Sequence, residues 1–455
     1  MRSLLHITSL ALGLWGTSVN AINVTWTDDS SIKDAAATVA YGLVKFYTGN
    51  NTGDVPGNLP DPYYWWEAGA MFGALIDYWW ITGDESYNNI TTQAILHQVG
   101  DDEDFMPSNQ TLTEGNDDQG FWAMATMAAA ERKYPDLPDD DPQWLALTQA
   151  VFNEYVTRWD TAHCEGGMRW QIFTFNTGYD YKNSISNGCF FNIAARLARY
   201  TGNDTYSDWA AKIWKWGETV GLLSDYKVYD GITISDSNCS STDTAQWSYN
   251  AAIFLHGASV MYNITESSTW KTRVDGMLED VTSTFVKSNI MYEQFCEENE
   301  QCNQDQRSFK GYLSRWLAAT TQMAPYTYET IYPLILASAK AAATVCTGTD
   351  SDYKGHDGTA CGFSWLETSY DGKVGVGAQM NALSVIMYTL VDQATTSYTT
   401  TTGGTSKGNA NAGNSDSNNA KNEKAITGAD RAGAAIITVI MSAGVVAGTY
   451  FVLSG

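Results

Sequence analysis

The stretch that decides the fold reads Glu67-Ala68-Gly69-Ala70-Met71-Phe72-Gly73-Ala74. Its small residues recur along a helix, and small side chains let neighbouring helices pack closely. Stretches of the same kind begin near Gly120, Gly188, Asn250, Gly311 and Gly377. Their spacing is a weak repeat of about sixty residues, which predicts one structural unit used several times.

Each of these stretches is followed by a more amphipathic helix, as at 206–216 and 270–278. Turns at 82–84 and 201–204 separate helices, because glycine ends one helix and Asp or Ser can cap the next. Small-faced inner helices paired with outer ones predict an all-α fold, the (α/α)6 toroid or six-hairpin barrel. The segment before each inner helix would then line one rim of a central cavity. An irregular helical bundle without a shared cavity is the alternative.

One large domain, 22–394, is expected, because no Pro-, Gly- or Ser-rich break interrupts it. From Ser397 the composition changes to Thr, Gly, Asn and Ser, so residues 395–420 are expected to form a flexible linker. Residues 1–21 are expected to be a secretory signal peptide, since an apolar run follows Arg2 and leads to the small-residue cleavage pattern Val19-Asn20-Ala21.

The C-terminal region has the order of a glycosylphosphatidylinositol (GPI) attachment signal. Small residues at 415–420 are followed by a polar spacer and by the apolar stretch 432–453. We expect Asn418 to be the attachment residue and 421–455 to be removed on maturation. An ordinary single-pass anchor is the alternative, although the apolar stretch has no basic flank after it. Either way, the domain is expected outside the cell, with the membrane contacted only through the anchor.

The composition agrees with an extracellular protein. The chain has seven cysteines, which in an oxidising compartment predict three disulfides and one buried thiol. The expected pairs are Cys296 with Cys302, Cys346 with Cys361 and Cys164 with Cys239, which leaves Cys189 free. Glycosylation sequons occur at Asn23, Asn50, Asn89, Asn109, Asn203, Asn238 and Asn263.

Charge excludes one class of partner. The formal net charge of -25 repels phosphate backbones, so nucleic acid is not expected as a partner. No Cys/His spacing indicates a zinc site, and neither a metal nor another cofactor is expected. The acidic run Asp139-Asp140-Asp141 is interpreted as a solvated loop before a helix, with a cation site as the alternative.

Two adjacent carboxyl groups, Asp117 and Asp118, stand where an inner helix is expected to begin. Inside a helix, neighbouring side chains diverge by about 100°, but at a loop-to-helix junction they can converge. Gly115 and Gly120 permit an irregular backbone there. One ionised carboxylate beside one protonated carboxyl suits a glycosidase nucleophile and acid/base, and a separation of about 5 to 5.5 Å predicts retention at the anomeric carbon. A helix cap with a charged first turn is the alternative.

The aspartate pair lies in the first of several characteristic segments. They are residues 115–123, 167–172 and 178–188, joined in the same order by 65–69, 249–250 and 309–311. These segments resemble the signature segments of glycoside hydrolase family 76, the α-1,6-mannanases, and they span nearly the whole domain. The sequons and the anchor signal favour the fungal cell-wall members of the "defective in filamentous growth" and "defective cell wall" type over secreted bacterial mannanases.

The resemblance implies the (α/α)6 fold, with Asp117 as nucleophile and Asp118 as general acid/base. It also implies α-mannose-containing glycans as partners, namely the GPI core glycan and α-1,6-mannan. The reaction would be hydrolysis, or transfer of a GPI-anchored protein to cell-wall glucan as acceptor. Both share a glycosyl-enzyme step, and the sequence does not separate them. We expect a monomer at the outer face of the plasma membrane and in the cell wall.

Further residues of the matched or rim segments are predicted to bind the sugar. They are Trp66, Asn116, Trp122, Tyr179, Asp180, Asn183, Asn187, Asp230 and Asn250. Helix capping is the alternative for the polar residues, above all for Asn187, and core packing is the alternative for the tryptophans. Arg169 and Lys182 are expected to pair with internal carboxylates.

Three classes of function are consistent with these features. The first is a retaining α-mannosidase or transglycosidase. The second is a non-catalytic glycan-binding wall protein on the same fold. The third, a structural or adhesive surface protein, is the least favoured because the domain is compact. Carboxyl groups of Asp117 and Asp118 that pointed to opposite sides would contradict the enzyme.

Overall fold

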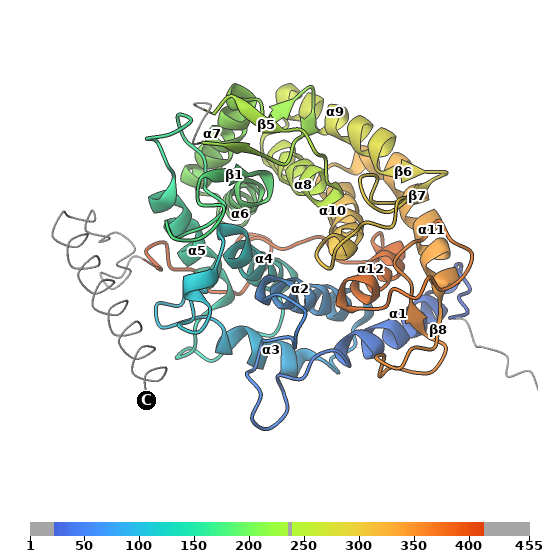
Figure 1. Ribbon diagram of the computed structural model, residues 1–455. Coiled ribbons are helices and arrows are strands. Elements are labelled where there is room, and N and C mark those ends of the chain that lie inside the picture. Colours follow the sequence, from blue (N-terminus) through green and yellow to red (C-terminus); the bar gives the residue numbers. More distant parts are fainter. Residues whose placement is uncertain (1–21, 235–238, 414–455) are drawn as a thin grey trace, which may run out of the picture.

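The computed structural model describes residues 22–234 and 239–413. Within these ranges, long helices alternate along the chain between an inner and an outer ring (Figure 1). The inner helices are α2 (Trp65–Thr82), α4 (Asn116–Arg132), α6 (Ser184–Thr201), α8 (Ser248–Thr265), α10 (Phe309–Met323) and α12 (Val376–Met387). The outer helices are α1 (Asp29–Val44), α3 (Asn88–His97), α5 (Trp144–Arg158), α7 (Asp204–Val220), α9 (Ser268–Thr284) and α11 (Tyr328–Val345).

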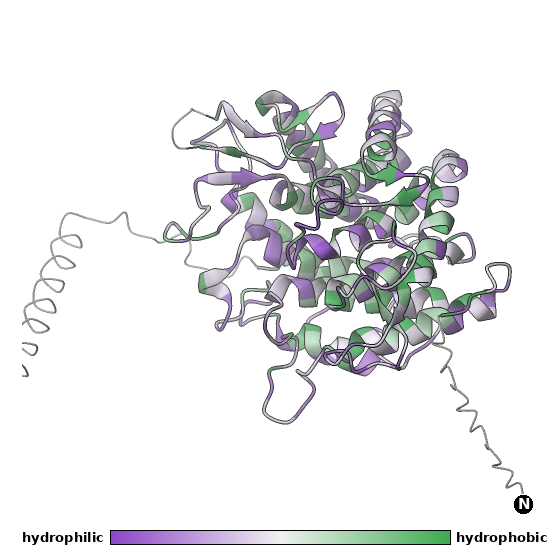
Figure 2. Cartoon of the chain, turned by 45° about the vertical axis from the view of Figure 1, so that its right-hand side comes forward, coloured by the Kyte–Doolittle hydropathy of each residue, from purple (hydrophilic) through white to green (hydrophobic). Residues whose placement is uncertain are grey.

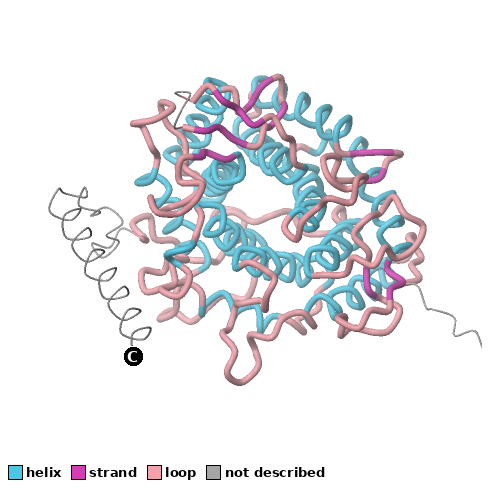
Figure 3. The backbone as a smooth tube through the Cα atoms, viewed as in Figure 1, coloured by secondary structure: helices cyan, strands magenta, loops and turns pink. Residues whose placement is uncertain are grey.

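The ring closes between its two ends. Each inner helix packs against the next, and α12 packs against both α10 and α2. The first helix of the described chain, α1, covers α12 from outside, so the N-terminal segment completes the last hairpin. The tube drawing shows the resulting circle of helices, with loops and short strands around it (Figure 3). The predicted (α/α)6 toroid is confirmed.

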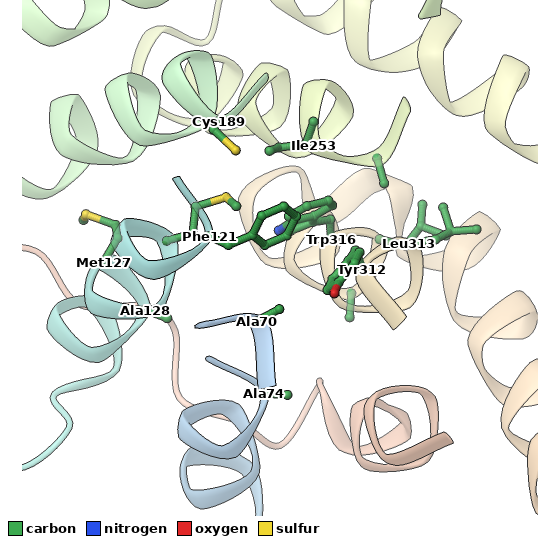
Figure 4. Packing of buried hydrophobic residues seen from close by; sticks show 14 of the residues in the cluster. Ala70, Ala74, Phe121, Met127, Ala128, Cys189, Ile253, Tyr312, Leu313 and Trp316 are labelled. Atoms are coloured by element: carbon green, nitrogen blue, oxygen red, sulfur yellow. The ribbon is translucent and has the colours of Figure 1, made fainter. Parts of the chain in front are cut away.

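Glycines allow the inner helices to meet at close range. A Cβ atom on Gly120 of α4 would lie 2.7 Å from the Cys189 side chain of α6, and one on Gly188 of α6 would lie 2.6 Å from Ile253 of α8. Either contact is too short for real atoms, so a larger residue would push the helices apart. The close-up shows Cys189 and Ile253 in this layer, beside Phe121 (Figure 4).

The outer helices are amphipathic, as expected. In α7, the side chain of Asn203 caps the first turn, while Gly202 ends the preceding inner helix in the left-handed conformation. The buried residues of α7 include Ile213 and Trp214, whereas Lys215 is exposed. Hydrophobic residues accordingly gather along the packed helices, and hydrophilic ones along the outer loops (Figure 2).

Short strands decorate the mouth of the toroid, at the N-terminal ends of the inner helices. A three-stranded antiparallel sheet has the order β1 (Tyr181–Asn183), β4 (Gly231–Thr233), β5 (Ser241–Asp243). Asn183 pairs with Gly231, which ties the start of α6 to the segment before α8. The remaining strands form hairpins: β2 (Leu223–Ser224) with β3 (Lys227–Val228), β6 (Val286–Lys287) with β7 (Ile290–Met291), and β8 (Cys346–Gly348) with β9 (Ala360–Cys361).

The first part of the expected linker, 395–413, is not a free linker. We call it the strap, because it crosses the rear of the toroid, at the C-terminal ends of the inner helices (Figure 1). Tyr398 N–H donates to the Glu131 carbonyl at 2.6 Å, and Thr400 N–H donates to the Tyr200 carbonyl at 3.0 Å. The prediction was wrong here because backbone groups of the strap bind helix ends, and composition does not report such bonds.

The three expected disulfides are confirmed, and Cys189 is a buried free thiol. Six of the seven sequon asparagines lie on exposed positions, namely Asn23, Asn50, Asn89, Asn109, Asn203 and Asn263. Asn238, residues 1–21, Asn418 and the predicted attachment signal lie outside the described residues. Within the described part of the chain, no helix is both long and apolar enough to cross a membrane.

Candidate active site

Asp117 and Asp118 occupy the first turn of α4, at the mouth of the toroid. Backbone contacts fix the segment before them. Gly115 forms an isolated antiparallel β-bridge with Gln171, and Asn116 N–H donates to the Trp170 carbonyl at 2.8 Å. This pairing fixes where α4 begins and therefore where both carboxyl groups point.

The two carboxyl groups converge. A Cβ atom on Gly115 would lie 2.4 Å from Asp117 Oδ1 and 2.9 Å from Asp118 Oδ2. Two oxygens that close to one point are at most about 5.3 Å apart, which is shorter than the about 6.5–9.5 Å of an inverting glycosidase. The Gly115 N–H donates to Asp118 Oδ2 at 2.6 Å, and Asp118 N–H donates to Asp117 Oδ1 at 3.2 Å. The same residues thus also cap the helix, so the two interpretations of the pair are not exclusive.

Among the described residues, no ion pair joins a cation to either carboxyl group of the pair. Burial raises the pKa of Asp117 to about 7, although its hydrogen bond from Asn183 acts in the opposite direction. Burial and then the charge of Asp117 raise the pKa of Asp118 well above its usual range. Asp117 therefore ionises first and keeps its neighbour protonated.

Asn183 is the predicted sugar-binding residue that reaches the pair. Its Nδ2 donates to Asp117 Oδ2 at 3.1 Å, while its Oδ1 accepts from Ser186 N–H and so caps α6. One residue thereby fixes both the helix start and the orientation of the Asp117 carboxylate. Two residues earlier on the same strand, the Tyr181 hydroxyl donates to Asp230 Oδ2 at 2.6 Å, which places Asp230 on the same face.

The opposite face of this strand holds an ion cluster. Arg169 Nη2 lies 2.8 Å and Lys182 Nζ lies 3.3 Å from Asp160 Oδ2. Burial acts to raise the pKa of Asp160, but these cations outweigh it and the pKa is lowered. The prediction that Arg169 and Lys182 pair with an internal carboxylate is confirmed.

Three of the predicted contact residues have side chains that are engaged by other parts of the protein. Trp122 has no exposed surface and packs in the core, with Trp65 at 5.2 Å. Asn187 is also fully buried, and its amide binds both backbone groups of Met168. Asn116 is 2% exposed; it donates to the Arg169 carbonyl and accepts from Arg158. The two asparagines position the loops of the site.

The remaining predicted contacts are spread around the mouth. Trp66 is partly exposed and lies 4.7 Å from Phe121 and 6.0 Å from Tyr312, ring to ring. Asn250 is buried, and neither polar atom of its amide has a protein partner among the described residues. Tyr179 lies apart from the pair, in a neighbouring pocket of about 350 Å³, where it stacks under Arg169. Asp180 is exposed, and its carbonyl accepts from Ile234 N–H.

Sequence reasoning missed three acidic residues at or just before the first turns of inner helices. Asp305 precedes α10, and burial raises its pKa to about 6; its charge acts on both Asp117 and Asp118. Glu67 and Glu114 are buried, and none of their carboxyl oxygens has a protein partner in the described chain. Burial raises the pKa of both. The rule that segments before inner helices line the mouth would have identified Asp305.

This arrangement suits acid/base and nucleophilic chemistry by carboxyl groups. Across the described ranges, no group of three or more His, Cys, Asp or Glu residues is arranged to hold a metal ion. In the predicted acidic loop, Asp139 instead pairs with Lys407 of the strap at 2.5 Å.

Comparison with known proteins identifies the fold and its relatives. The chain is 45% identical over 431 residues to mannan endo-1,6-alpha-mannosidase DCW1 of Saccharomyces cerevisiae, with 94% of each chain covered. It is 42% identical over 461 residues to mannan endo-1,6-alpha-mannosidase DFG5 of Candida albicans, with both chains fully covered.

Solved structures of related proteins share the fold of this chain. The crystal structure of Dfg5 from Chaetomium thermophilum in complex with glucosamine is 44% identical and superposes with a TM-score of 0.81, covering 86% of this chain and 97% of that one. An α-1,6-mannanase of Salegentibacter shares the fold at 19% identity and a TM-score of 0.61, covering 79% and 98%. The model of Glycosyl hydrolase family 76 matches residues 31–401. The chain therefore belongs to glycosyl hydrolase family 76.

Proposed function

We propose that this protein is a retaining enzyme that cleaves α-mannosides and transfers the glycan to another sugar. The observation that carries the proposal is the convergence of the Asp117 and Asp118 carboxyl groups, whose facing oxygens lie closer together than the about 6.5–9.5 Å of an inverting pair. The names of its relatives, mannan endo-1,6-alpha-mannosidases, support an α-1,6-linked mannoside as substrate.

The roles of the two aspartates follow from their surroundings. Asp117 accepts hydrogen bonds from Asn183 and from the Asp118 N–H, both of which stabilise its charged form. It is therefore the nucleophile that attacks the anomeric carbon. Asp118 stays protonated beside that charge. It donates its proton to the leaving oxygen and then, as a base, takes a proton from the incoming hydroxyl or water.

The substrate we favour is a GPI core glycan, and the acceptor is cell-wall glucan. A core glycan of this kind contains mannose and glucosamine, and the glucosamine complex of Chaetomium thermophilum Dfg5 supports a site that accepts such sugars. The predicted signal peptide, anchor and exposed sequons support a location at the outer plasma membrane and in the wall. In this proposal, the protein links GPI-anchored mannoproteins to the wall.

A product assay tests this function. The purified protein is incubated with α-1,6-mannobioside or a defined GPI core glycan, with and without glucan oligosaccharides, and the products are analysed by mass spectrometry and NMR. Transfer products with retained configuration support the proposal. Free sugar alone identifies a hydrolase, and tight binding without any product identifies a glycan-binding protein; either result would overturn transfer.

A further inference from the structure

A second polar cluster lies inside the toroid, deeper along its axis than the catalytic pair. It surrounds a cavity of about 40 Å³ whose lining residues come from every inner helix or its end. The charged or titratable members are Asp77 of α2, Glu131 and Arg132 of α4, Arg196 of α6, His256 of α8 and Arg315 of α10, with Tyr388 directly after α12. Figure 4 shows Ala70, Phe121, Ala128, Tyr312 and Trp316 around the same space.

The Asp77 carboxylate forms ion pairs with two arginines. Its Oδ1 lies 2.9 Å from Arg132 Nη2, and its Oδ2 lies 2.7 Å from Arg315 Nε. The Tyr388 hydroxyl donates to Asp77 Oδ2 at 2.8 Å. All these groups are largely buried: the exposed fraction is 1% for the Asp77 side chain, 8% for Arg132 and 14% for Arg315. This triad carries one positive charge in excess.

No other lining residue balances that charge. Glu131 is already paired with Arg196 at 2.6 Å, so this second pair is neutral. Burial and the nearby arginines hold the pKa of His256 well below its usual value, so its ring is neutral as well. Burial also raises the pKa of Tyr388, which keeps its hydroxyl protonated. Of the residues that line the cavity, three are arginines and only two are acids.

The cavity also holds an unused donor. Arg132 Nε is buried and has no hydrogen-bond partner among the described residues. A buried guanidinium with an open donor, next to empty space and a net positive charge, costs free energy unless an anion or water fills that space. By the same measure of volume, one water needs about 10 to 15 Å³, so this cavity has room for one small ion with one or two waters.

The strap closes this space from behind. Ser397 lines the cavity, and Trp80 Nε1 donates to Thr395 Oγ1 at 3.1 Å. Phe121 and Tyr312, whose rings contact Trp66 at the mouth, also line this cavity, so an ion bound beside Arg132 and Arg315 would lie toward its rear end.

We propose that this cavity binds one monovalent anion of halide size, held by the guanidinium groups of Arg132 and Arg315. The anion neutralises the Arg132–Asp77–Arg315 triad and thereby stabilises the contact between α2, α4 and α10. It takes no part in the reaction at Asp117 and Asp118.

Bromide provides a direct test on the whole protein. Crystals of the wild-type protein, prepared in gluconate and soaked in sodium bromide, are measured at the bromine absorption edge. We expect an anomalous peak within hydrogen-bond distance of the Arg132 and Arg315 guanidinium groups. Absence of a peak at these groups, in crystals that show bromide elsewhere or nowhere, overturns the proposal.

Thermal unfolding gives a second readout. At constant ionic strength, replacing gluconate with chloride or bromide should raise the Tm of the wild-type protein by about 2 °C, with saturation. Arg315→Met removes the excess charge while leaving the Arg132–Asp77 pair, so the anion-specific rise should vanish. Arg273→Met is the matched control, because Arg273 of the outer helix α9 pairs with Glu218 of α7 and does not line the cavity. A rise that is equal for all anions, or that survives in Arg315→Met, contradicts the site.

Discussion

Carboxyl groups are partly buried at the mouth of this toroid and fully buried in its interior, yet their pKa values shift in opposite directions. At the mouth, Asp117 and Asp118 lie beside each other and near Asp305, no cation of the described chain pairs with them, and their pKa values are raised. In the interior, burial also acts to raise the pKa of Asp77, but Arg132 and Arg315 outweigh it and the pKa is lowered. Burial is common to both regions, so the neighbouring cations decide whether a buried aspartate can exchange protons or serves as a permanent charge.

The comparison also separates activity from stability. A group whose pKa is raised toward neutrality is suited to proton transfer, but keeping it charged costs folding free energy. A group held by two guanidinium ions is useless as an acid, but its removal leaves those ions unpaired. Substitutions of the aspartates at the mouth should therefore reduce activity more than stability, whereas substitutions in the interior should reduce stability more than activity.

The largest expected effect is on catalysis. Asp117→Asn or Asp118→Asn should each reduce kcat/KM on an α-1,6-mannobioside by about 10²–10⁴-fold, because each removes one of the two reacting groups. Steady-state kinetics measure this. Asp208→Asn, on the exposed side of α7, is the matched control and should retain activity. Full activity in either active-site variant would remove the basis of the assigned mechanism.

The next effect is on stability. Asp77→Asn should lower the free energy of unfolding by about 3–5 kcal/mol, because it leaves two buried guanidinium groups without a counter-charge. Urea unfolding followed by circular dichroism measures the change, and Asp208→Asn should stay within about 0.5 kcal/mol of the wild type. A loss below about 1 kcal/mol for Asp77→Asn would mean that the cluster does not depend on this carboxylate.

The pH dependence of stability should differ in sign between the two regions. The pKa of Asp117 is raised from 3.8 to about 7 on folding, so the native protein binds the extra proton and this site loses stability as pH rises through that window. Asp117→Asn should therefore be more stable than the wild type at pH 8 by roughly 2 kcal/mol, with no such gain at pH 4. Asp77 has a lowered pKa, so its stabilising effect is present above the unfolded pKa and disappears as pH falls.

Chemical denaturation of the wild type, Asp117→Asn and Asp77→Asn between pH 2 and 8 tests this. The stability gain of Asp117→Asn should grow as pH rises from about 4 to 8, whereas the stability loss of Asp77→Asn should stay nearly constant over that range and shrink only as pH falls below 3.8. Parallel curves of the same sign would contradict the contrast between the regions.

The smallest effect concerns Asn183. Its hydrogen bond lowers the pKa of Asp117 against burial, so Asn183→Ala should raise that pKa by about one unit. The acidic limb of the kcat/KM profile should then move to higher pH. Asn299→Ala, on an exposed loop, is the matched control. An unshifted acidic limb would show that the Asn183 amide does not tune the nucleophile.

The ring of inner helices was predictable because its signal is repeated in the sequence. Stretches such as 67–74 use small residues where helices must meet, and this requirement recurs in every hairpin. The strap was not predictable from composition. Its Thr- and Gly-rich segment resembles a linker, whereas the bonds that hold it, such as Tyr398 N–H to the Glu131 carbonyl, use backbone groups that every residue has.

Asp117 and Asp118 were identified as candidates because the repeat places these adjacent carboxyl groups at the start of an inner helix, and the resemblance to family 76 implied their roles. It was harder to predict which side chains of α4 line the site. Phe121 and Trp122 are neighbours, but successive residues of a helix point about 100° apart. Phe121 contacts Trp66 at the mouth while Trp122 is buried against Trp65. That difference depends on the rotation of α4, which is set by the pairing of Gly115 with Gln171 and is not visible in local sequence.

The strap also has a consequence for how the protein is made. It is synthesised after every helix of the toroid, yet it binds α4, α5 and α6, which leave the ribosome much earlier. Helical hairpins can assemble in order from the N-terminus as they emerge. The carbonyls of Glu131 and Tyr200, however, stay exposed to water until their partners, about two hundred or more residues downstream, have been synthesised. Completion of the domain thus depends on the strap, so a chain that ended near residue 394 would form a ring whose rear is still open.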